Sequence, residues 1–320
     1  MLYPDERATY WVATLQIPAG GEVILSGEYP HARYMSFNIY NSRLEPLDAL
    51  ADVELAADTN PASTNTFALG ANRNALPKKY QVRIVAGVRP DDPAQRAPNT
   101  LYSFQALGGQ RQPSNSATII YRIYVEDKDR DLTGDVGLPQ VGLKQANGTV
   151  VTGAQACRDL TPALSVSLAD SLNTLNPPVD APFSPAANKN LQWLKFFDLQ
   201  TVQANRFNAT PAGQGFRSSF GGNTNNAGGF ASNVHNNYIY AVASRAHGAI
   251  AVMEMQVPTT PKTRERNPIM QDGDMRYWSM CTNEANSTRY YDCIYDEEAV
   301  ILPGNRTILA IGRGNERPNN

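Results

Sequence analysis

The sequence predicts a mainly β protein of two related antiparallel β units, arranged as sandwich or jelly-roll layers, with one helix and a long Gly/Asn-rich loop inserted between them. Two observations lead to this fold class. Short runs rich in β-branched and aromatic residues alternate with turn residues along the chain, and an ordered set of these runs occurs twice. The length of 320 residues allows about two folding units or one large β domain.

Four elements recur in the same order near the two ends of the chain. The runs GGEVILSGEYP, ARYMSFNIYN and KYQVRIVAGVRP in the first half correspond to HGAIAVMEMQVP, MRYWSMCTNE and NRTILAIGRGNERP in the second. The remaining element is a pair of acidic residues before the last run, Asp48 and Asp52 in one copy and Asp292 and Asp296 in the other. The ordered set favours a duplicated β unit whose loops have changed in length.

This comparison predicts an N-terminal β unit at residues 8–156, a connection at 157–237, and a C-terminal β unit at 238–318. We expect the two β units to pack as one compact body. ATIIYRIYVED, residues 117–127, predicts a buried strand. The dipeptide Asn147–Gly148 marks a tight hairpin turn soon after it.

The connection contains the predicted helix and the long loop. Thr161 and Pro162 are typical of a helix start, and an apolar stripe follows at Leu164, Leu168, Leu172 and Leu175. Residues 211–237 are dominated by Gly and Asn. Loops of this length inside compact proteins are usually functional covers or disordered segments.

Composition excludes several classes of function. The 28 basic and 30 acidic residues give a net charge of -2, which predicts no nucleic-acid partner and no polybasic membrane anchor. The sequence has no run of about 18 apolar residues, so it predicts no membrane span. The first residues, MLYPDERATYW, lack the pattern of a signal peptide. We therefore expect either a cytosolic protein or a chain that starts after a cleavage point.

Two of the three cysteines are spaced for a disulfide. Cys281 and Cys293 lie in aromatic-rich runs on either side of TNEANSTR, a pattern typical of strand, turn and strand. Side chains that face each other across an antiparallel pair have β-carbons about 4.5 to 5.5 Å apart, close enough to form the bond after small adjustment. The alternative is a pair of reduced, half-buried thiols. Cys157 is expected to be a small buried side chain.

No common catalytic or cofactor signature is present. The motifs G-x-S-x-G and H-E-x-x-H, the P-loop, the C-x-x-C pair and a complete dinucleotide-binding fingerprint are all missing. The three histidines lie in distant segments, which disfavours a zinc site built on imidazoles. The candidates for catalytic roles are His31, Arg33 and Tyr34, with acidic help from Asp48 or Asp52.

Alternating carboxylates follow the strand predicted at residues 117–127. The acidic residues of this segment are Asp127, Asp129, Asp131 and Asp135. Oxygen ligands on a bending loop suit Ca²⁺, which is the one cofactor that the sequence suggests. The pattern departs from an EF-hand loop, because Gly134 comes two positions late and Leu138 stands where a bidentate Glu is needed. The alternative is a solvated acidic turn with local salt bridges.

Strand alternation gives a candidate binding surface. In RYMSFNIYN, Met35, Phe37 and Ile39 share the face that we expect to join the core. The opposite face is a row of residues with hydroxyl and amide groups: Tyr34, Ser36, Asn38 and Tyr40, with Tyr277 and Ser279 in the second copy. Such a face suits stacking and hydrogen bonding to a neutral polar ligand. The alternative is that both faces are covered and the hydroxyls bond to neighbouring strands.

The runs GEYPHARYMSFNIYNS, YRIYVEDKDRDLTGDVGLP and RYWSMCTNE with YYDCIYD resemble a group of uncharacterised exported bacterial proteins, related to a β family of unknown function. The resemblance spans most of the chain. It implies a β-rich fold and an extracytoplasmic setting, secreted or periplasmic, and it supports the Cys281–Cys293 bridge. It implies no activity and no catalytic residue. This chain departs from the family in lacking a leader, which suggests a trimmed chain.

The leading interpretation is a secreted or periplasmic binding protein for a neutral polar ligand such as a glycan, with residues 211–237 covering the site. A glycan-active enzyme, hydrolase or lyase, and a structural envelope protein are the alternatives. An enzyme should gather ionisable groups in one cleft, and a binding protein should have a groove lined by Tyr and Asn. A structural protein should instead present a flat, self-complementary surface.

Overall fold

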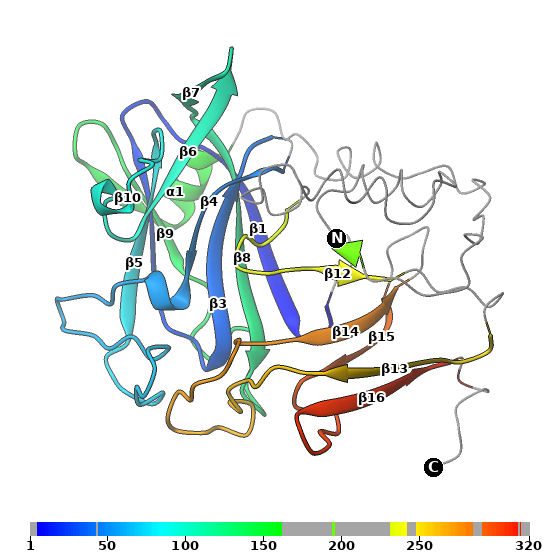
Figure 1. The fold of residues 1–320 in the computed structure, drawn as a ribbon. Coiled ribbons are helices and arrows are strands. Elements are labelled where there is room, and N and C mark those ends of the chain that lie inside the picture. Colours follow the sequence, from blue (N-terminus) through cyan, green and yellow to red (C-terminus); the bar gives the residue numbers. More distant parts are fainter. Residues whose placement is uncertain are drawn as a thin grey trace. The chain divides into compact units, whose positions relative to one another are not determined.

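The computed structural model describes residues 5–42, 44–161, 194–195, 231–241, 248–283, 290–312 and 314. Within these residues the chain is mainly β, as the sequence predicts (Figure 1). The chain divides into two units. The larger unit comprises Arg7–Ser167 and Thr260–Tyr277, and the smaller unit comprises Met1–Glu6, Leu168–Thr259 and Trp278–Asn320. None of the helices described is long and apolar enough to cross a membrane.

Two sheets form the larger unit. The first has four antiparallel strands in the order β1 (Ala8–Gln16), β8 (Ser116–Glu126), β3 (Ala32–Tyr40) and β4 (Pro46–Ala51). The second has six strands in the order β10 (Val150–Thr152), β9 (Gln140–Lys144), β2 (Glu22–Glu28), β5 (Lys79–Ala86), β6 (Thr100–Leu107) and β7 (Gln110–Pro113). The sheets form a sandwich, as predicted, with short 3₁₀ turns η1 (Asp52–Glu54) and η2 (Pro93–Gln95) in connecting segments.

One strand pair departs from the purely antiparallel arrangement that the sequence suggests. β5 and β6 are parallel, with Arg83 opposite Thr100. A parallel pair needs a crossover instead of a tight turn, and the connection at residues 87–99 supplies it.

The hairpin predicted at Asn147–Gly148 is present, joining β9 to β10, and Gly148 has a φ of 87°. The strand predicted at 117–127 is β8, which is buried over most of its length.

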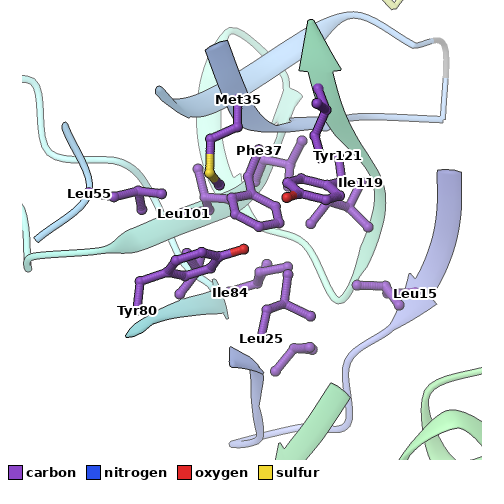
Figure 2. Packing of buried hydrophobic residues seen from close by; sticks show 14 of the residues in the cluster. Leu15, Leu25, Met35, Phe37, Leu55, Tyr80, Ile84, Leu101, Ile119 and Tyr121 are labelled. Carbon is purple, nitrogen blue, oxygen red and sulfur yellow. The ribbon is translucent and has the colours of Figure 1, made fainter. Parts of the chain in front are cut away.

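The hydrophobic core lies between the two sheets (Figure 2). Met35, Phe37 and Ile39 are all buried in it, as strand alternation predicts. The Phe37 ring stacks on Tyr121 of β8 with 4.6 Å between the ring centroids. From the second sheet, the Tyr80 ring meets Phe37 edge-on at 5.8 Å. These aromatic rings join the two sheets, because each buries a large apolar area at their interface.

The prediction that Cys157 is buried is wrong. The helix α1 (Gly153–Leu160) buries Ala156 and Leu160 against the core. These two residues are four positions apart and share one helix face, whereas the next residue is rotated by about 100°. The Cys157 thiol is therefore exposed.

Several segments of the sequence analysis lie outside the described residues. They are the helix predicted from Pro162 onward, most of the 211–237 loop, and His247.

The described strands of the smaller unit form three antiparallel pairs. β13 (Ala251–Gln256) pairs with β16 (Arg306–Ile311), and β14 (Ser279–Asn283) pairs with β15 (Tyr290–Tyr295). The third pair is short, β11 (Leu194–Lys195) with β12 (Ile239–Tyr240). Within the second pair, Cys281 lies opposite Cys293 and the two form a disulfide, which confirms the predicted bridge.

The strand pairings agree with the duplication seen in the sequence. In the first copy, the first strand β2 pairs with the last strand β5, and β3 forms a hairpin with β4. In the second copy, the first strand β13 pairs with the last strand β16, and β14 forms a hairpin with β15. Glu28 and Gln256 both stand two residues before a proline, and they face Lys79 and Arg306.

The β3–β4 and β14–β15 hairpins share a register. Ser36 of the first Arg-Tyr-x-Ser run faces Ala51, the residue before Asp52. Ser279 of the second run faces Tyr295, the residue before Asp296. Asp52 and Asp296 are both 1% exposed. The common register of the two hairpins agrees with a duplicated β unit.

The division into units differs from the boundaries predicted at 8–156 and 238–318. Thr260–Tyr277, which lies between β13 and β14, belongs to the larger unit. Its backbone holds it there: Gly70 N donates to Met270 O at 2.9 Å, and Lys128 N donates to Arg264 O at 2.6 Å. The first copy joins its equivalent strands through a short turn. The second copy therefore carries an insertion that packs on the larger unit.

The loop at residues 127–137 packs against the turn between β2 and β3. His31 N donates to Gly134 O at 3.1 Å, and Asp127 N donates to His31 O at 2.9 Å. Gly134 has a φ of 62°, and a Cβ at this position would lie 2.6 Å from His31 N and 2.9 Å from the Pro30 Cβ. Only glycine combines this backbone conformation with so close an approach.

We expect Gly134→Ala to lower the free energy of unfolding by more than Gly137→Ala, measured by urea denaturation. Gly137 has a φ of 71°, but nothing lies within 4 Å of a Cβ built there. The control should therefore show only the backbone cost of about 1 to 2 kcal/mol, whereas Gly134→Ala adds a steric clash with backbone. Equal losses in the two variants would contradict the packing described for this loop.

Candidate functional site

The predicted ligand face of β3 is covered. Tyr34, Ser36, Asn38 and Tyr40 point away from the sandwich core, and none is more than 6% exposed. β3 is thus buried along both of its faces. This is the covered arrangement that the sequence left open as the alternative, so the face is not an open groove in this structure.

At the centre of this face lies Arg122 of β8. It stands opposite Ser36 of β3 on one side and Tyr10 of β1 on the other. Its guanidinium carbon lies 5.5 Å from the ring centroid of Tyr10 and 5.7 Å from that of Tyr40. Arg122 also donates a hydrogen bond to Asn38 Oδ1, and it is 1% exposed. The rings attract the cation electrostatically, which helps to retain a charge away from water.

The Asn38 amide has a defined orientation. A guanidinium only donates hydrogen bonds, so the atom that faces Arg122 has to be Oδ1. Ser36 Oγ is also 3.4 Å from that oxygen. Asn38 Nδ2 then has no hydrogen-bond partner in the part of the chain that the structure describes, although Asn38 is fully buried. A buried donor left without an acceptor costs about 1 to 3 kcal/mol.

Aromatic rings extend the face along β8. The Tyr124 ring centroid lies 4.9 Å from that of Tyr34, 6.2 Å from Tyr10 and 5.7 Å from Tyr277. We call Tyr10, Tyr34, Ser36, Asn38, Tyr40, Arg122, Tyr124 and Tyr277 the arginine–tyrosine cluster. Tyr277 belongs to it through the inserted segment of the larger unit. Ser279 lies in the smaller unit, where its hydroxyl hydrogen-bonds to Asp5, and is not part of the cluster.

Arg122 is the site residue that the sequence analysis missed. The run at 117–127 was interpreted only as a buried strand, yet its alternation carried the signal. Ile119, Tyr121 and Ile123 belong to the core face, so Arg122 and Tyr124 have to lie on the opposite one. An arginine in the middle of an apolar strand indicates a buried charge that needs partners.

The two acidic catalytic candidates lie at different positions along β3. Asp48 lies opposite Ile39 of β3, while Asp52 Oδ2 accepts from Met35 N at 3.0 Å. Ile39 and Met35 are four residues apart on the strand, or about 13 Å. Arg33 is buried, with its Nε donating to Thr263 Oγ1 at 3.1 Å. The two carboxylates therefore contact different parts of β3.

Each of the two acidic candidates has a structural partner. Asp48 Oδ2 accepts from Tyr102 N at 3.1 Å, and Asp48 Oδ1 lies 3.2 Å from Arg89 Nε. Burial raises the pKa of Asp48, and the positive charge of Arg89 opposes that shift. Asp52 Oδ1 lies 3.7 Å from Arg276 of the inserted segment. These contacts hold strands and loops in place.

His31 lies in cationic surroundings. Burial, reinforced by the positive charges of Lys78, Arg130 and Arg73, lowers the pKa of His31 to about 4. Arg73 is itself buried and forms an ion pair with Asp127 at 2.6 Å. The imidazole of His31 is consequently neutral near neutral pH.

The aspartates considered for calcium have separate partners. Asp127 pairs with Arg73, and Asp129, whose side chain is 76% exposed, lies 3.7 Å from Arg266. Asp131 Oδ1 instead accepts from Thr133 N at 2.8 Å and from Asp135 N at 2.9 Å. Among the described residues, these carboxylates do not form a group with ligand atoms within 4.8 Å of one another. The segment forms a hydrogen-bonded acidic turn in this structure.

One group of potential metal ligands does occur in the described part of the chain, Asp5 with Cys281 and Cys293. Both sulfur atoms are joined in the disulfide. They are therefore not thiolates, which are the form that binds metal ions.

Comparison with known proteins assigns no function. No family model matches the chain, and no curated protein matches it. A solved structure of an uncharacterized protein from Burkholderia cenocepacia is similar at 11% identity and a TM-score of 0.40, covering 97% of this chain and 67% of that one. The VPA0106 protein from Vibrio parahaemolyticus is similar at 16% identity and a TM-score of 0.24, covering 42% and 30%.

Acidification should destabilise the wild-type protein more than the His31→Gln variant between pH 6.5 and pH 4. The folded-state pKa of His31 is about 4, below its ordinary value of 6.5. In that window the unfolded chain binds a proton that the folded chain does not, so the free energy of unfolding falls as the pH falls. Urea unfolding at several pH values measures it. Identical pH profiles for the two proteins would contradict the buried, neutral state of His31.

Proposed function

We propose that the protein binds a small, neutral polar ligand such as a glycan at the arginine–tyrosine cluster. The observation that carries this proposal is the buried amide nitrogen of Asn38, which has no acceptor among the described residues. A hydroxyl or ring oxygen of a ligand would supply that acceptor. Because an unsatisfied buried donor is costly, its presence favours a site that a ligand completes.

The chemistry of the cluster suits a sugar. A sugar presents hydroxyl groups at its edges and apolar C–H groups on its ring faces. The Asn38 amide and Ser36 hydroxyl offer hydrogen-bonding groups for the edges. The rings of Tyr34, Tyr40 and Tyr124 offer apolar surfaces for stacking on the faces. A neutral ligand also adds no second charge to a buried region that already holds Arg122.

Access to the cluster requires motion, because its central residues are buried. A ligand can reach them only if the groups that cover this face move aside, as with the lids of many binding sites.

Binding is favoured over catalysis for this site. The described residues of the cluster include one arginine but no carboxylate or imidazole, and acid–base chemistry uses such groups. The carboxylates of Asp48 and Asp52 bond to backbone amides elsewhere. An extracytoplasmic setting, periplasmic or secreted, fits the Cys281–Cys293 disulfide, since such bonds persist in oxidising compartments. A structural envelope role is the alternative if no ligand is found.

The Asn38→Asp variant should separate binding from stability. A carboxylate keeps the size of the amide and still accepts from Arg122, but it removes the donor that has no partner. We expect the Tm of the free variant to be equal to or above that of the wild type. The rise in Tm caused by a binding saccharide should become smaller, because the ligand oxygen loses its N–H donor and a hydroxyl has to turn to donate instead. Thermal shift with a panel of neutral mono- and disaccharides measures both.

Tyr121→Phe provides the matched control. Tyr121 precedes Arg122 on the same strand, but its ring belongs to the core face. We expect this variant to keep the saccharide response of the wild type. Absence of a response in the wild-type protein across the panel, or an unchanged response in Asn38→Asp, would reject the proposed site.

A further inference from the structure

Lys78 stands out among the lysines that the structure describes. It is 4% exposed, although lysine side chains are almost never fully buried unless they are paired. Lys128 and Lys144 lie 3.5 Å from Glu265 and Glu22, respectively. For Lys78 there is neither an ion pair nor a side-chain hydrogen bond with any residue in the described ranges. Lys79, the next residue, is exposed and serves as an internal reference.

The backbone fixes the position of Lys78 beside the turn between β2 and β3. Tyr29 N donates to Lys78 O at 2.9 Å. The same turn contains His31, whose backbone bonds to Asp127 and Gly134 of the 127–137 loop. Lys78 thus lies where the start of β5, the end of β2 and this loop meet.

Charges of both signs act on the Lys78 amine, and the largest effect among them is that of Glu28. The positive charges are those of Arg73 and Arg130, and each already has its own carboxylate, Asp127 for Arg73 and Asp135 for Arg130. The neutral imidazole of His31 adds no charge near neutral pH. Of the groups around the amine, Glu28 is the carboxylate without an ion pair among the described residues.

These surroundings favour the uncharged amine. Burial lowers the pKa of Lys78; Glu28 and Asp127 oppose that shift, and Arg130 and Arg73 reinforce it. The amine nitrogen is not among the buried polar atoms that lack a partner, so it keeps some contact with solvent. Burial of a lysine without an ion-pair partner is one way in which proteins activate a nucleophilic amine.

We propose that Lys78 is a nucleophilic amine that forms a Schiff base with small aldehydes. The Nζ lone pair attacks the carbonyl carbon, and one of the two Nζ protons moves to the carbonyl oxygen, which gives a carbinolamine. Loss of the nitrogen proton and of the hydroxyl group as water then forms the C=N bond. The step needs no oxidant or reductant. This site is separate from the arginine–tyrosine cluster, and it does not depend on the proposed function.

The test is reductive trapping on the full-length protein. Glycolaldehyde with sodium cyanoborohydride at pH 7 converts any imine to a stable secondary amine, which fragmentation mass spectrometry assigns to individual lysines. We expect Lys78 to be labelled faster than Lys79, because only the unprotonated amine reacts. Labelling of Lys78 no faster than that of Lys79 would overturn the proposal.

Two charge variants test the cause of the reactivity in opposite directions. Arg130→Gln removes a nearby positive charge and should slow the labelling of Lys78, whereas Glu28→Gln removes a negative charge and should speed it. The rate at Lys79 serves as the control within each sample, and circular dichroism checks that each variant is folded. If Arg130→Gln does not fold, Glu28→Gln decides alone. Unchanged Lys78 labelling in Glu28→Gln would overturn the proposed activation. So would a Lys78 that does not react with the aldehyde in a protein whose Tm rises in inorganic phosphate, because that result indicates an anion-binding site instead.

Discussion

The burial of β3 on both faces is the constraint on which the larger unit depends. One face supplies the sandwich core through Met35, Phe37 and Ile39. The polar groups of the other face have no access to water, so they have to bond to one another or to whatever covers them. The register of β3 with β8 places Arg122 beside Asn38 and between two tyrosine rings. This arrangement leaves the Asn38 amide nitrogen without an acceptor among the described residues. That unsatisfied donor is what distinguishes the face, as a candidate site, from a purely structural core.

The same two strands also position the Lys78 region. β8 carries Arg122 in its middle and leads into Asp127 at its end, where the loop turns back onto His31. The buried ion pair between Asp127 and Arg73 fixes the start of that loop. A buried pair of this kind contributes more to a defined geometry than to stability, because desolvation offsets much of its attraction. The charge of Arg130, which this loop carries, acts on Lys78.

Local patterns in the sequence predicted the features that depend on neighbouring residues. Alternation of side chains identified the core face of β3, and the spacing of Cys281 and Cys293 identified the disulfide. What failed depended on contacts between distant segments. The covering of the outer face of β3 and the burial of Lys78 arise from segments that no local pattern connects to them. Arg122 lay within reach of the same alternation argument, but its partner Asn38 becomes visible only once the strand register is known.

Within the described residues, the second of the two similar segments lacks a cluster of this kind because one strand has no counterpart there. In the described smaller unit β14 pairs only with β15, so there is no counterpart of β8 and no counterpart of Arg122. The Arg-Tyr pair of the second copy serves the larger unit instead: Arg276 lies 3.7 Å from Asp52, and Tyr277 packs on Tyr124. The insertion before this pair allows that, since it carries residues 260–277 onto the larger unit. The second copy thus contributes Tyr277 to the arginine–tyrosine cluster and Arg276 to the surroundings of Asp52, while its hairpin keeps the register of the first copy.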